Sequence, residues 1–230
     1  MLTQSFSQAN ESKNEGAFDE YRGKLLSALN KAAIVFSQNA ASFDDVMTDG
    51  LNIIADAVDL GRVTVWHRIF ESGMVYGRQV FRWEKDSGGS TTSFLGLQNV
   101  NYTEFAPEWE EIISAGESMN GPVDRLPGGW FLKKFGAVSA FITPIFENGN
   151  LWGVVIFDNN HKEIVFSANE TDIMQSAAYL CVNTIVREEL RLESGTTTSS
   201  GGMILPYKGI LLAAPKGAWF RKQISVTCRP

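Results

Sequence analysis

The stretch that decides the fold is Gly136–Asp158, GAVSAFITPIFENGNLWGVVIFD. In it, two apolar and β-branched segments flank the dipeptide Asn148-Gly149. Asn-Gly between two such segments is the strongest short signal for a two-residue hairpin turn. We therefore predict a β-hairpin with strands over 138–146 and 151–158.

The region before this hairpin predicts two helices and a second hairpin. Apolar residues at three- and four-residue steps indicate a helix over about 19–39, and a second helix is expected from an N-cap at Ser42 to a stop at Gly61. The period then changes to two. This alternation predicts strands over 62–70 and 74–83, with a turn at 71–73. Both faces of the first strand carry large side chains, so we expect it to be covered on both sides.

Residues 84–136 are less regular. We expect a loop over 84–93, a short strand within 95–105, a helix that Pro107 opens, and a short helix over 130–135.

The chain continues into a long last helix. Ser167 and Glu170 form a capping box at its start, and the helix is expected to run to about Glu193. The order of elements predicts an α+β fold, with a central antiparallel sheet between helical layers.

Composition and charge exclude several classes. The chain has 44% hydrophobic residues and a formal net charge of −6, which gives no reason to expect nucleic-acid binding. Two cysteines are too few for a disulfide framework, so a reducing, cytoplasmic location is the default, and no metal site is expected. No apolar stretch reaches the ~18 residues of a membrane span. The sequence contains no motif typical of catalysis or of cofactor binding, so it does not identify a cofactor.

The glycines, Ser139 and Pro144 of the hairpin, with the helix start at Phe166-Ser167 and Glu170, resemble the closing elements of a GAF domain. Residues 107–127 resemble the helix-and-loop lid of GAF domains in bacterial sensor histidine kinases. The resemblance covers about residues 19–193. It implies end helices on one face of the sheet, and on the other face short helices and loops that form a lid over a small-molecule pocket.

We expect that lid to come from residues 84–136. Flat aromatic walls and polar anchors suit such a pocket. The predicted ligand-binding residues are Trp66, Arg68, Trp83, Trp109, Trp130, Ser139 and Asp158. The competing interpretation is that the tryptophans are core residues and that Ser139 is structural.

His67 has two interpretations as well, a hydrogen-bonded core histidine or a metal or haem ligand. Cys181 shares a helical face with apolar residues and is expected to be a small buried hydrophobe. The lid contains no cysteine. It therefore matches neither the GAF proteins that attach a bilin nor those that reduce free methionine sulfoxide.

The resemblance implies a non-catalytic sensory and dimerisation module of a two-component protein, with its output domain absent from this chain. The expected partners are an unidentified small molecule and a second copy bound through the terminal helices. The alternatives are a ligand-free dimerisation scaffold or, third, a cofactor-dependent redox protein.

The expected organisation has three parts. Residues 1–16 form a flexible leader, 17–194 form the sensory domain, and 195–230 form a linker with an apolar, basic tail. All 26 acidic residues precede this last part, whereas five basic residues lie in it. That tail is either a membrane-surface or partner-binding segment or a truncated or foreign end.

Overall fold

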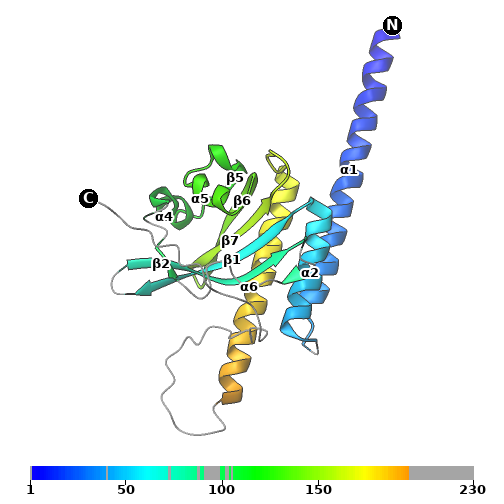
Figure 1. Cartoon of the computed structure of the whole chain (residues 1–230). Coiled ribbons are helices and arrows are strands. Elements are labelled where there is room, and N and C mark those ends of the chain that lie inside the picture. Colours follow the sequence, from blue (N-terminus) through cyan, green and yellow to red (C-terminus); the bar gives the residue numbers. More distant parts are fainter. Residues whose placement is uncertain are drawn as a thin grey trace, which may run out of the picture.

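The computed structural model describes residues 2–39, 41–71, 74–86, 89–90, 99–101, 104 and 106–196 (Figure 1). Its centre is a seven-stranded sheet with the strand order β3-β2-β1-β7-β6-β5, in which β4 also pairs with β2 and every pairing is antiparallel. The strands are β1 (Arg62–Glu71), β2 (Met74–Glu84), β3 (Gly89–Ser90), β4 (Asn99–Val100), β5 (Met119–Pro122), β6 (Ser139–Glu147) and β7 (Asn150–Asn159).

Helices cover both faces of this sheet. The long helices pack on one face and share its main apolar core; they are α1 (Leu2–Phe36), α2 (Phe43–Val58) and α6 (Ala168–Thr196). Short helices and a second, smaller core cover the other face; they are α4 (Pro107–Ser114), the 3-10 helix η1 (Val123–Arg125) and α5 (Gly129–Lys134). The predicted three-layer α+β arrangement is confirmed (Figure 1).

The β6–β7 hairpin forms as predicted. Asn148 and Gly149 have φ angles of 50° and 79°, and Glu147 pairs with Asn150, so the turn has two residues with left-handed backbone. That is the geometry which an Asn-Gly pair favours. Pro144 of β6 lies beyond the residues that pair with β5, so no β5 residue needs a hydrogen bond from it. The register of β6 against β7 shifts shortly after it, between Ile145 and Phe146.

Gly153 allows the close contact between β7 and β1. A Cβ atom at this position would lie 2.0 Å from the carbonyl oxygen of Trp66. The two residues belong to strands that are far apart in sequence but adjacent in the sheet. The backbones approach closely here, and no residue with a side chain can replace Gly153 without moving the strands.

The helix caps follow the expected chemistry with one difference. Ser42 accepts a hydrogen bond from the Asp45 N–H at 3.1 Å, and Ser167 and Glu170 form the reciprocal capping box of α6. The second helix does not end at Gly61. Asp59 closes it with a left-handed φ of 57°, a conformation that aspartate tolerates because its short side chain bonds locally.

Two other predictions need correction. Helix α1 begins at Leu2, not near Asp19, so residues 2–16 continue the predicted helix toward the N-terminus. They contain no proline, and extending an existing helix costs little. Strand β5 was not predicted, because it is short and ends in Gly121-Pro122, which favour irregular structure.

Some predicted features lie outside the described residues. These are most of the turn at 71–73, much of the 84–93 loop, most of the 95–105 strand and residues 197–230. Among the described residues, no helix combines the length and the apolar character that crossing a bilayer requires.

We predict that Gly153→Ala lowers the free energy of unfolding by about 2–3 kcal/mol, since overpacking against a backbone oxygen forces the two central strands apart. Urea denaturation of the full chain measures this. The matched control is Gly23→Ala on the exposed side of α1, where an added Cβ meets nothing within 4 Å. That substitution should raise stability by about 0.5–1 kcal/mol. Equal stability of Gly153→Ala and the wild type would contradict the assigned contact.

Candidate ligand site under the lid

Two adjacent cavities lie between the sheet and the lid. The polar cavity has a volume of about 20 Å³ and is lined by Arg62, Thr64, Trp66, Gln79, Phe131, Leu132, Phe135, Ile156 and Asp158. The apolar cavity has a volume of about 40 Å³ and is lined by Trp66, His67, Arg68, Gly77, Val100, Trp109, Ile113, Phe131, Gly153, Val154 and Ile156. They share three residues, so they form one divided hollow. Volumes of this size hold a few water molecules at most.

Trp66 is the wall between the two cavities. Its indole N–H donates to the Thr64 hydroxyl at 3.0 Å, two residues earlier on the same face of β1. This bond satisfies the only polar atom of the indole side chain and holds the ring along the sheet. The ring lines both cavities and also packs against the smaller apolar core.

Two contacts position α4 beside the apolar cavity, one to the sheet and one within the lid. Arg68 of β1 donates to the Glu110 carboxylate of α4 at 2.5 Å, and both side chains are partly exposed. Trp109, one residue earlier, is buried and donates its indole N–H to the Pro127 carbonyl at 2.7 Å. The first contact is a charged bond that water can reach, and the second anchors α4 to the rest of the lid.

The polar cavity ends at a charged cluster, which consists of the buried Arg62, Arg82 and Asp158 and the partly exposed Glu84. Arg62 donates its Nε–H to Asp158 Oδ2 at 2.8 Å and its Nη1–H to the Phe135 carbonyl of the lid at 2.7 Å. Arg82 donates to Glu84, which also lies 3.6 Å from Arg62. The cluster thus joins β1, β2, β7 and the end of α5.

Asp158 is 1% exposed, and its Oδ1 accepts no hydrogen bond from the residues that the structure describes. Burial raises the pKa of Asp158 to about 6, and the neighbouring Arg62 opposes the shift. The group therefore changes charge within a mildly acidic range that ordinary aspartates do not reach.

His67 packs as a core histidine does. Its ring lies edge-on to Trp152, with 4.6 Å between the ring centroids. Burial, with the positive charge of Arg78, lowers the pKa of His67 to about 4, so the imidazole is neutral at pH 7. Among the described residues, no group of three metal-ligating side chains is present.

The structure brings four of the seven predicted site residues to the hollow and places the others elsewhere. Trp66, Arg68, Trp109 and Asp158 line it. Trp83 is 1% exposed in the core on the opposite face of the sheet, where its N–H donates to Asn52. The prediction for Trp83 is wrong because a register shift between β1 and β2 changes which residues of β2 face the lid.

Trp130 and Ser139 lie outside the hollow for different reasons. Trp130 is 46% exposed on α5, with the Lys134 ammonium 4.4 Å from its ring centroid. Ser139 is fully buried, donates to the Lys162 carbonyl and accepts from the Ile164 N–H, both at 2.8 Å. Both hydrogen bonds of its hydroxyl go to the segment that connects β7 to α6. Ser139 therefore has a structural role, as the competing interpretation expected.

Sequence reasoning missed three polar residues of the hollow, Arg62, Thr64 and Gln79. Arg62 and Thr64 could have been predicted from the sequence, because alternate residues of one strand share a face and Trp66 was already assigned to the pocket. Gln79 could not, since the same register shift governs its orientation.

The sequence matches the GAF domain family over residues 42–185. The chain belongs to the GAF domain family. The GAF sheet, its terminal helices and its lid all fall within or beside the matched range. This confirms the resemblance on which the expected fold rested.

Among curated proteins, this GAF domain is similar to "Methanogenesis regulatory histidine kinase FilI" from Methanothrix harundinacea (strain 6Ac). The two are 30% identical over 174 residues, which cover 75% of this chain and 20% of the relative. The chain therefore spans about a fifth of the length of that kinase.

Solved structures agree on the fold. A phycocyanobilin-bound GAF domain from a cyanobacterial phytochrome has a TM-score of 0.53 at 16% identity and covers 73% of this chain and 96% of its own. Free methionine-R-sulfoxide reductase from Neisseria meningitidis, in complex with its substrate, has a TM-score of 0.50 at 11% identity and covers 76% of this chain and 92% of its own. At these identities the likeness concerns the fold.

We predict that Asp158 makes folding weaken as the pH rises from about 4 to about 6. The unfolded chain releases this proton near the ordinary aspartate pKa of 3.8, whereas the folded chain holds it to a pKa of about 6. The folded state thus binds more protons in this window, so raising the pH favours unfolding.

The variant Asp158→Asn lacks this titration and serves as the reference. Subtracting its free energy of unfolding from that of the wild type at each pH cancels the other carboxylates. The difference should fall as the pH rises through the window. A difference that stays level or grows would show that pairing with Arg62 outweighs burial.

Proposed function

We propose that this chain is a non-catalytic sensory module of a two-component signalling protein, in which a small molecule binds in the divided hollow under the lid. The observation that carries the proposal is the hollow itself. It has an aromatic wall at Trp66, apolar lining on one side and buried polar groups on the other. Such a mixture is typical of small-molecule sites. The similarity to a histidine kinase supports the signalling context.

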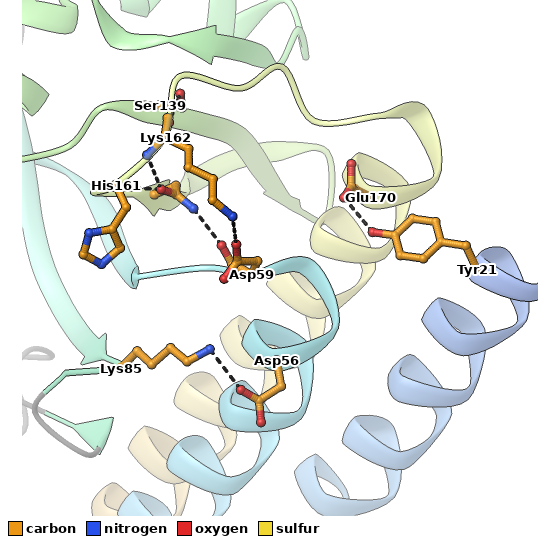
Figure 2. A network of polar contacts seen from close by, with 9 residues as sticks. Tyr21, Asp56, Asp59, Lys85, Ser139, His161, Lys162 and Glu170 are labelled. Carbon is orange, nitrogen blue, oxygen red and sulfur yellow. Dashed lines mark hydrogen bonds and ion pairs between the residues drawn. The ribbon is translucent and has the colours of Figure 1, made fainter. Parts of the chain in front are cut away.

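The lid is connected to the terminal helices by a short series of contacts. Asn120 of β5 donates to the Phe166 carbonyl at 2.8 Å and accepts from the Phe166 N–H at 3.1 Å. Phe166 immediately precedes the capping box of α6. The Glu170 carboxylate of that box accepts the Tyr21 hydroxyl of α1 at 2.7 Å (Figure 2). A movement of β5 with the lid would therefore reach the start of α6 and then α1.

The terminal helices support the proposed homodimer. The described part of α1 exposes Phe18, Leu26 and Ile34, eight residues apart, and α6 exposes Tyr179 and Leu190. Exposed apolar side chains repeated along two long helices favour pairing with a second copy.

We propose that the sensory domain spans residues 17–194, that it acts in the cytoplasm, and that its partners do not include nucleic acid.

The ligand-free scaffold remains the second candidate, because one observation favours it: the open volumes of about 20 and 40 Å³ are smaller than those of ordinary ligand pockets. The redox alternative gains no support from Cys181. This residue is fully buried, and burial raises the pKa of its thiol, which keeps it protonated.

We predict that native mass spectrometry of the full chain, purified without denaturation, shows a dimer that carries a bound small molecule. Denaturing mass spectrometry of the same sample is the control, since it should return the bare polypeptide mass. A dimer without additional mass, which also gains no thermal stability from a metabolite library, would favour the scaffold instead.

We also predict that Asn120→Ala loosens the start of α6. The Phe166 N–H loses its acceptor, and a lost hydrogen bond corresponds to about fivefold faster amide exchange at this position. Hydrogen–deuterium exchange over residues 164–171 measures the effect. Asp124→Ala, which removes an exposed ion pair with Lys133 in the lid, is the matched control and should leave this segment unchanged.

A further inference from the structure

Two buried oxygen atoms of the polar cavity have no hydrogen-bond donor within the described part of the chain. They are Asp158 Oδ1 and Gln79 Oε1, and their residues are 1% and 7% exposed. Buried acceptors in folded proteins are almost always paired with protein or with an ordered molecule. Both residues line the cavity. A molecule inside the cavity would supply the donor that the described residues do not provide.

The charges around these oxygens argue for an uncharged donor. The charged cluster contains two guanidinium groups, Arg62 and Arg82, and two carboxylates, Glu84 and Asp158, so its formal charges cancel. A cation or an anion brought into this buried position would add an unbalanced charge, which is costly away from water. A neutral N–H group pairs with Asp158 without that cost.

The walls argue for a flat molecule. Trp66 and Phe131 border both cavities, and Phe135 covers the polar one. Phe131 and Phe135 are packed edge-to-face, with 5.1 Å between their ring centroids. Aromatic walls of this kind favour another aromatic ring, either stacked or edge-on.

We propose that the hollow takes an uncharged, flat heteroaromatic molecule whose ring N–H donates to Asp158 Oδ1, while a second polar atom faces Gln79. The ring lies against Trp66 and Phe131, where the two cavities meet. Without the ligand, the polar cavity has room for about one water molecule, which would supply the donor instead. Because the hollow is narrow, the proposal requires that α5 moves outward to admit the ring. This inference rests on the proposed function, since it requires that the hollow binds a small molecule.

The test compares indole with benzofuran, which has nearly the same shape but an oxygen atom in place of the N–H. Calorimetry on the full chain should give an affinity for indole at least about fivefold higher than for benzofuran, the ratio expected from one hydrogen bond. Benzoate serves as the anionic probe and should bind more weakly than indole. Equal binding of indole and benzofuran would overturn the proposal.

The variant Asp158→Asn sharpens the test. Arg62 Nε donates to this side chain, so it would hold the amide oxygen and turn the NH₂ group toward the cavity. A donor would then face the ligand, and the preference for indole should fall to about one or reverse. The control is Asp172→Asn, the same chemical change on the exposed surface of α6, which should leave the ratio unchanged. An indole preference that survives in Asp158→Asn would exclude Asp158 as the acceptor.

A second measurement does not depend on the variant folding. Nitrogen-15-labelled indole bound to the wild-type chain should show an N–H proton shifted downfield and protected from exchange with water. An N–H that exchanges as fast as in free indole would contradict the contact. The failures are distinguishable: if benzoate binds in the hollow and indole does not, the ligand class is wrong while the sensory role stands. If no probe binds and no mass copurifies, both proposals fail.

Discussion

The register of β1 against β7 is the constraint on which the rest of the structure depends. Gly153 sets it, because the Trp66 carbonyl occupies the space that a side chain would need. In a strand, a shift of one residue exchanges the two faces. With this register, Trp66 and Asp158 face the lid, while Val65 and Phe157 enter the core beneath the long helices. The ligand site and the main core are thus two consequences of one backbone contact.

The two faces of the sheet carry different physical chemistry. The helical face is a large apolar core to which all three long helices contribute. The lid face has a smaller apolar core and, at one end, the charged cluster. Buried ion pairs add little to stability compared with apolar packing of the same volume, but they define which polar partners are accepted. A sheet with one apolar face and one mixed face is therefore suited to hold its long helices firmly while its other side stays adaptable.

Besides apolar packing, polar contacts join the elements on both sides of the sheet. Arg62 binds the lid through the Phe135 carbonyl, Asn120 binds the approach to α6, and Arg187 of α6 donates to the Phe36 carbonyl at the end of α1 at 2.7 Å. Such bonds have direction, so they transmit a displacement more specifically than apolar packing does. In the proposed function, apolar packing stabilises the fold, whereas these directional polar bonds transmit the displacement that ligand binding causes.

By itself, the sequence determined the features that are local in the chain. The Asn148-Gly149 turn, the capping box at Ser167 and the alternation along β1 each depend on residues within a few positions of one another, and each formed as predicted. Their order was sufficient for the α+β plan. Trp66, Arg68 and Asp158 were assigned to the pocket through the family resemblance, because aromatic walls and polar anchors suit such a site.

Only the tertiary structure decided the faces of β2 and the closing of the hollow. The register shift opposite Val65 and Trp66 places Gln79 toward the lid and Trp83 toward the helices, although simple alternation would put both on one face. No glycine or proline in that part of β2 marks the shift. The position of the register shift depends on how β1 and β2 pair when helices cover both faces of the sheet. The energies of such pairing involve residues far apart in sequence.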